Sequence, residues 1–129
     1  MDRVTPSKVS KADADAAQML IRAIGTIATA TRRETAPGTL AIALDQTAQK
    51  LLRQVVVACE DVDSPYHQFP VARPLFDALR AVLAAGYRPA ANAPSGVEMV
   101  VATRTLAAAI RQAKCAKAAL DEADAVPAA

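Results

Sequence analysis

The sequence TLAIALDQTAQKLLRQVVVACED, residues 39–61, decides the predicted fold. At about 100° per residue, its apolar side chains gather on one face and its polar side chains lie opposite. The apolar face contains Leu40, Leu44, Ala48, Leu51, Val55 and Ala58. Spacing of three and four residues is typical of an amphipathic helix, whereas a half-buried strand alternates at every second residue. The stretch therefore predicts a long helix packed against the rest of the chain.

Several apolar residues lie outside this stripe. Ile42, Val56 and Val57 map to or near the polar side of the predicted helix. Val100 and Val101 stand off the main stripe of the last predicted helix. Apolar side chains that one face cannot absorb indicate a second neighbour, either another helix of the chain or a second subunit. These five residues are therefore predicted to form a self-association surface, and a homodimer is the expected arrangement.

Further helical segments flank the central one. Residues 11–33 carry an apolar stripe that follows Ser10, a suitable N-cap residue. Residues 72–85 and 95–123 show the same period, and Ser95-Gly96-Val97-Glu98 matches a capping box. Proline-broken segments separate the later helices. The sequence therefore predicts an all-α, single-domain bundle of about four helices at 11–33, 39–61, 72–85 and 95–123, with flexible tails at 1–9 and 125–129.

Composition limits the possible classes of protein. The chain has 129 residues, of which 53% are hydrophobic and 3% aromatic, so the core is predicted to consist of Ala, Leu, Ile and Val side chains. A net charge of +2 indicates no particular partner. No apolar run approaches the ~20 residues of a membrane span, so no membrane partner is expected. Cys59 and Cys115 lack CxxC spacing, and the simplest interpretation is a reduced, cytoplasmic protein.

The side chains needed for catalysis are scarce. The chain contains 1 histidine, His67, in a proline-rich loop, and sequence spacing alone does not supply the geometry of a nucleophile–base pair. Two distant cysteines and no Glu-x-x-His motif provide no ligand set for zinc or a di-iron centre. No glycine-rich phosphate loop is present. We therefore expect no catalytic residue, no metal site and no cofactor, and a protein that is not an enzyme.

Two groups of side chains are candidates for binding. Tyr66, His67 and Phe69 form a candidate contact loop, although the aromatic rings more simply fill one end of an alanine-rich core. The second group is a basic stripe on the last predicted helix, formed by Arg104, Arg111, Lys114 and Lys117. Such a stripe can bind nucleic acid or an acidic partner, whereas a solvated helix face is the simpler interpretation.

One run of the sequence has a family resemblance. Residues 69–88, FPVARPLFDALRAVLAAGYR, are followed by a loop and a predicted capped helix. This arrangement resembles the middle of HEPN-type helical domains. The ribonuclease members of that family carry an Arg followed four to six residues later by a His, whereas here His67 has no Arg at that spacing before it. The resemblance therefore implies at most a degenerate, nuclease-like helical domain.

These observations give a ranked expectation of function. The first expectation is a non-catalytic helical-bundle interaction protein that associates with itself through protein–protein contacts. The alternative is binding of nucleic acid or an acidic partner through the basic stripe. A degenerate HEPN-type domain is the third.

Overall fold

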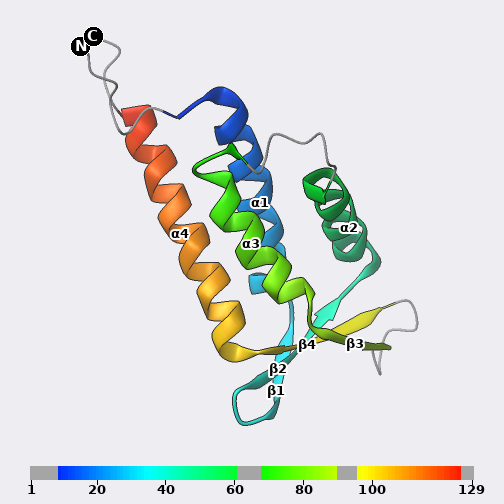
Figure 1. The fold of residues 1–129 in the computed structure, drawn as a ribbon. Helices are drawn as coiled ribbons and strands as arrows, with labels where there is room; N and C mark the ends of the chain where they lie inside the picture. Colours follow the sequence, from blue (N-terminus) through cyan, green and yellow to red (C-terminus); the bar gives the residue numbers. More distant parts are fainter. Residues whose placement is uncertain (1–8, 61–67, 90–95, 126–129) are drawn as a thin grey trace, which may run out of the picture.

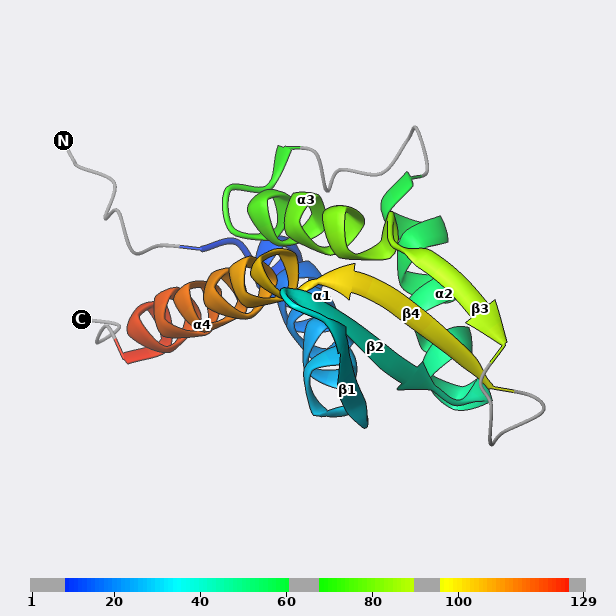
Figure 2. The same ribbon diagram turned by 90° about the horizontal axis from the view of Figure 1, so that it is seen from below.

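The computed structural model of the chain describes residues 9–60, 68–89 and 96–125. In chain order its elements are α1 (Lys11–Thr29), β1 (Arg32–Ala36), β2 (Thr39–Leu44), α2 (Gln46–Glu60), α3 (Ala72–Leu83), β3 (Gly86–Pro89), β4 (Val97–Ala102) and α4 (Thr103–Ala125). The helices lie to one side of a single sheet (Figure 1). The view from below shows that no described helix covers the opposite face of the sheet (Figure 2).

The prediction of an all-α bundle is wrong, because the described residues include a four-stranded antiparallel sheet and the fold is α+β. The first part of the predicted helix 39–61 is strand β2, and α2 begins only at Gln46. Leu40 and Leu44 are four residues apart, a spacing that fits one face of a helix and one face of a strand equally well. Ile42 lies between them and is buried in the same core, whereas Ala43 is exposed. Leu40, Ile42 and Leu44 thus face the core at every second position, which is the period of a strand, and Ala41 on the other face is also buried, at 1% exposure.

The predicted helix 95–123 is divided in the same way. Its first residues form β4, in which Met99 and Val101 are buried in the core, and α4 follows without a break. Glu98 is therefore a strand residue and not the third residue of a capped helix. Ser95, the other half of the predicted capping box, lies outside the described residues.

The predicted bounds of the other two helices agree with the structure to different degrees. Helix α1 ends at Thr29, so the last residues of the predicted helix 11–33 belong to β1 instead. Helix α3 agrees closely with the predicted helix 72–85. The predicted flexible tails 1–9 and 125–129 lie outside the described residues, apart from their inner ends.

The sheet joins two hairpins in the order β1-β2-β4-β3. The first hairpin turns at Gly38, whose φ of 76° is readily adopted only by glycine. The central strands β2 and β4 pair from Thr39 with Ala102 to Leu44 with Val97. Each half of the chain has the order helix, strand, strand, helix, and the two halves therefore meet along the central strand pair.

The core lies between the sheet and the helices. Helices α1, α3 and α4 pack against one another, and α2 packs against α1 and β2. The largest fully buried side chains are Phe76, Leu20, Ile24, Ile27, Ile42, Leu75, Leu79, Met99, Val55 and Val82. Apart from one phenylalanine and one methionine these are aliphatic, as the low aromatic content leads one to expect.

A buried carboxylate joins the N-terminal ends of α1 and α3. Asp13 on α1 is 2% exposed and is the buried charged residue among those described. Its Oδ1 accepts a hydrogen bond from the amide of Ala72 at 2.9 Å, and its Oδ2 accepts one from the amide of Val71 at 3.1 Å. Val71, the N-cap residue of α3, provides no side-chain cap of its own. Asp13 therefore satisfies amides at the start of α3 that would otherwise lack a partner.

Candidate partner-binding groove

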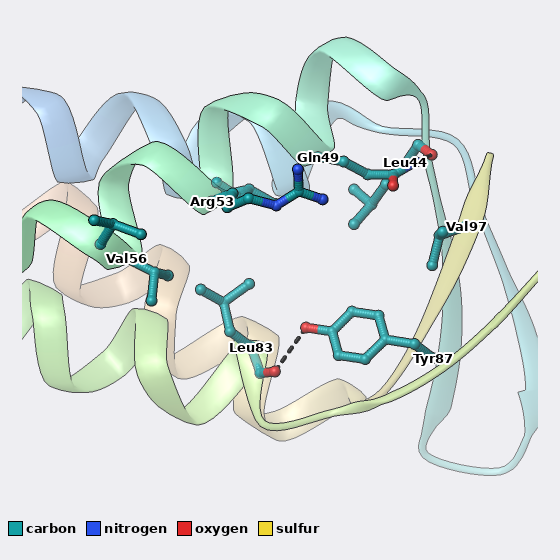
Figure 3. Close-up of a pocket in the computed structure, with 9 residues that line it drawn as sticks. Leu44, Gln49, Arg53, Val56, Leu83, Tyr87 and Val97 are labelled. Carbon is teal, nitrogen blue, oxygen red and sulfur yellow. Dashed lines mark hydrogen bonds between the residues drawn. The ribbon is translucent and has the colours of Figure 1, made fainter. Parts of the chain in front are cut away.

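A cavity of about 400 Å³ lies between α2 and the end of α3 (Figure 3). Leu44 of β2 and Val97 of β4 form its floor, while Leu83 of α3 and Tyr87 of β3 form one wall. Helix α2 forms the other wall with Gln49, Leu52, Arg53, Val56 and Val57. We call this cavity and its rim the α2–α3 groove.

The groove collects apolar surface that faces solvent. Val57 is 65% exposed and Tyr87 is 50% exposed, and these are the exposed large hydrophobic residues among those described. A single exposed apolar side chain requires no explanation. Here both exposed side chains border the same cavity.

Few polar groups interrupt the lining. The amide of Gln49 donates to the carbonyl of Leu44 at 3.0 Å, and the hydroxyl of Tyr87 donates to the carbonyl of Leu83 at 2.6 Å. Burial raises the pKa of the Tyr87 hydroxyl above its usual value of 10.0, so the group stays protonated and can keep this bond. Both polar groups therefore help to fix the walls of the groove.

Arg53 is the charged residue in the lining. Its guanidinium extends over the cavity (Figure 3). None of the acidic side chains in the described part of the chain forms an ion pair with it. The groove is thus an apolar surface with one positive charge that has no countercharge within residues 9–60, 68–89 and 96–125.

The groove exists because α2 diverges from α3. Helix α4 packs against both α1 and α3. Helix α2 occupies the equivalent place in the first half of the chain, but it packs against α1 and makes few contacts with α3 (Figure 1). A weak ion pair links the far end of α2 to α3, with Arg80 Nε 3.9 Å from Glu60 Oε2. Both side chains of this pair are about half exposed, so the pair adds little stability.

One stripe of α2 borders the groove. Arg53, Val56, Val57 and Glu60 are spaced as i, i+3, i+4 and i+7, which places them on one side of the helix. Val56 is half-buried, and the other three are exposed. The helix therefore shows a positive charge, two valines and a negative charge in a row.

The five residues predicted for self-association do not form one surface. Ile42 and Val101 lie in the core with 0% and 5% exposure, and Val100 lies on the opposite face of the sheet from them. Ile42, Val100 and Val101 stand in strands β2 and β4 and not in the predicted helices, which separates them from Val56 and Val57. Val56 and Val57 are brought together in the wall of the α2–α3 groove.

The predicted basic residues are exposed on α4 but do not share one face. Arg104, Arg111, Lys114 and Lys117 progress around the helix over roughly 140°. Lys114 and Lys117 border a shallow apolar groove against α1. Lys117 is also 3.7 Å from Asp121, which offsets part of its charge.

The predicted contact loop is only partly described. Tyr66 and His67 lie outside the described residues. Phe69 is half-buried and packs against the core. Within the described residues, no group of three or more His, Cys, Asp or Glu side chains could hold a metal ion. No helix in those same ranges is long and apolar enough to cross a membrane.

A charged cluster that was not predicted from the sequence lies on the uncovered face of the sheet. Glu98 Oε1 accepts from Arg88 Nε at 2.9 Å and from Arg33 Nη2 at 3.2 Å, so one carboxylate links β4 to both edge strands. Hydrogen bonding to Arg88 and the charge and hydrogen bond of Arg33 hold the pKa of Glu98 below its usual value of 4.5. The cluster is internally paired, which indicates a structural role.

Searches with the chain against protein-family models, curated proteins and solved structures find no match. Residues 69–88, which resemble the middle of an HEPN-type helical domain, form α3 and the first part of strand β3.

Proposed function

We propose that the protein is a non-catalytic interaction module that forms a homodimer through α2. The observation that carries the proposal is the order of side chains on the exposed stripe of this helix: Arg53, Val56, Val57 and Glu60. This order is self-complementary. When two copies of the stripe run antiparallel, the positive end of each faces the negative end of the other.

The register of such a pair follows from the sequence spacing. A two-fold axis between Val56 and Val57 brings these valines against those of the second copy. The same axis places Arg53 opposite Glu60 of the second copy, and Glu60 opposite its Arg53. Arg53, which has no acidic partner among the described residues, thereby gains one, and the exposed surface of Val57 is removed from water.

The expected dimer is weak. Stable interfaces bury roughly 800 Å² on each partner, whereas two turns of one helix with the adjoining rim of the groove offer less. We therefore expect an equilibrium between monomer and dimer that depends on protein concentration. The exposed thiol of Cys115 has no disulfide partner among the described residues, which supports a reducing compartment, and we propose a cytoplasmic location.

The test is a charge exchange measured by sedimentation equilibrium. Arg53→Glu and Glu60→Arg each place like charges opposite one another twice in the symmetric dimer. Each single variant should weaken association by about 2 kcal/mol, or roughly 30-fold in Kd. The double variant Arg53→Glu/Glu60→Arg restores opposite charges and should recover most of the affinity. Arg111→Glu on α4 makes the same charge change away from α2 and should leave the Kd unchanged.

The outcomes separate the proposal from its alternatives. A strict monomer at high concentration, or a double variant that is as weak as the single ones, would exclude pairing through α2. Binding of nucleic acid or an acidic partner through α4 predicts instead a low-salt complex that Arg111→Glu weakens. This alternative has less support than pairing through α2, because the four basic residues are spread widely around α4 and do not form one face.

A further inference from the structure

We infer that the α2–α3 groove is also a binding site for a small molecule with an apolar chain and a single carboxylate. The site lies within one chain, so binding does not require the dimer. Regulation of the dimer by such a ligand does rest on the proposed function, because the ligand and the second copy would compete for Arg53.

The size and lining of the cavity fit a small molecule. Its volume of about 400 Å³ lies within the roughly 300–1,000 Å³ typical of ligand pockets. The deep part is lined by Leu44 and Leu52, which are 3% and 5% exposed, together with Val97. An apolar chain that enters between the walls therefore reaches a floor without charged groups.

The charge at the rim defines the other end of the ligand. Arg53 is the charged lining residue, and it forms no ion pair with the acids of the described ranges. One positive charge balances one negative charge, which favours a carboxylate over a doubly charged phosphate. A guanidinium also matches the planar geometry of a carboxylate and can form two parallel hydrogen bonds with it.

The polar groups of the walls are oriented consistently with this arrangement. The hydroxyl proton of Tyr87 is directed to Leu83, and the amide of Gln49 is directed to Leu44. These bonds hold both side chains along the walls and turn their donors toward the protein backbone. Arg53 is thus the lining residue that extends over the open space (Figure 3). The acidic group should sit at the rim and the chain below it.

The test uses octanoate as the probe, with hexanoate and octanol for comparison. Binding is followed by amide chemical shifts in a titration of Glu60→Arg, the variant in which self-association is expected to be weakened, since Glu60 does not line the cavity. We expect shifts at Leu44, Val56 and Tyr87. Affinity should rise about fourfold for each CH₂ added between hexanoate and octanoate. Octanol should bind at least tenfold more weakly than octanoate.

Two variants locate the charge contact. Arg53→Gln in the same background should weaken octanoate about tenfold or more and leave octanol unchanged. Lys114→Gln, beside the shallow groove between α1 and α4, is the matched control and should have no effect. Absence of binding, equal affinity for octanoate and octanol, or shifts confined to α1 and α4 would each overturn the inference.

The ligand site and the dimer can fail separately. If octanoate binds Glu60→Arg in an Arg53-dependent way while the wild-type chain is a monomer at all concentrations, the ligand site stands and the proposed function falls. If the charge exchange confirms the dimer and octanoate does not bind, the proposed function stands and this inference falls. If both hold, octanoate should shift the wild-type protein toward monomer.

Discussion

Replacement of Asp13 by alanine tests the link between α1 and α3. The substitution removes acceptors for the amides of Val71 and Ala72, which lie 3.1 and 2.9 Å from its carboxylate. Hydrogen bonds to a charged group contribute about 1.5–3 kcal/mol each, and loss of a helix cap typically costs about 1 kcal/mol. Because water can reach part of the site at half-buried Val71, we expect Asp13→Ala to lower the free energy of unfolding by about 3 kcal/mol.

The assay is urea and thermal unfolding followed by circular dichroism. A loss of about 3 kcal/mol corresponds to a decrease in Tm of roughly 10 °C for a chain of this length. Asp13→Asn keeps one carbonyl oxygen and should lose about half as much. The matched control is Asp15→Ala, which breaks only an exposed pair with Lys11 at 3.1 Å and should cost less than about 0.5 kcal/mol. Equal stability of the Asp13 and Asp15 variants would refute the cap.

Outcomes are expected for four further variants. The pKa of Glu98 is lower in the folded state than its usual value of 4.5. The ionised carboxylate therefore stabilises the fold fully above pH 4.5, and this stabilisation is lost as the pH falls through the lowered pKa. Glu98→Gln should remove this pH dependence from the free energy of unfolding, measured by urea unfolding at acid pH. Gly25→Ala should stabilise by about 0.5–1 kcal/mol in thermal unfolding, since a Cβ there meets nothing within 4 Å, whereas Gly38→Ala should destabilise by about 1 kcal/mol because its φ is 76°. Tyr87→Phe should cost about 1 kcal/mol by losing its 2.6 Å hydrogen bond, and an unchanged midpoint would contradict that bond.

The spacing of apolar residues predicted a helix correctly where no strand directly precedes it. In α3, Leu75, Leu79 and Val82 recur at helical spacing and are buried, and the predicted bounds agree closely with the observed ones. The period failed where a short strand runs directly into a helix. Leu40 and Leu44 in β2 continue the spacing of α2, and β4 passes into α4 without a glycine or proline between them. At the β2–α2 junction the available local signal is Asp45, whose side chain accepts a hydrogen bond from the amide of Ala48 at 2.8 Å and caps α2, but the spacing of apolar residues does not show it.

The strands are defined by pairing between residues far apart in the sequence, which the local pattern of apolar residues does not show. The alternation in β2 identifies a strand only once β4 is known to pair with it. The groove was accessible in part, since Val56 and Val57 were singled out as apolar residues off the core stripe. Helical spacing alone places Arg53 on the polar side of this segment. Its spacing to both valines and to Glu60 was the available signal, whereas the contribution of Tyr87 depends on how α3 and β3 are placed.

The central pairing of β2 with β4 determines which step of folding is slow. Each hairpin and helix forms from residues close in the sequence, whereas Leu44 pairs with Val97, roughly 50 positions further along the chain. We therefore expect two partly structured halves, α1 to α2 and α3 to α4, to accumulate before β2 pairs with β4. At high concentration a half can meet its counterpart from another molecule, and refolding should then yield intertwined chains that exchange halves and separate only on unfolding.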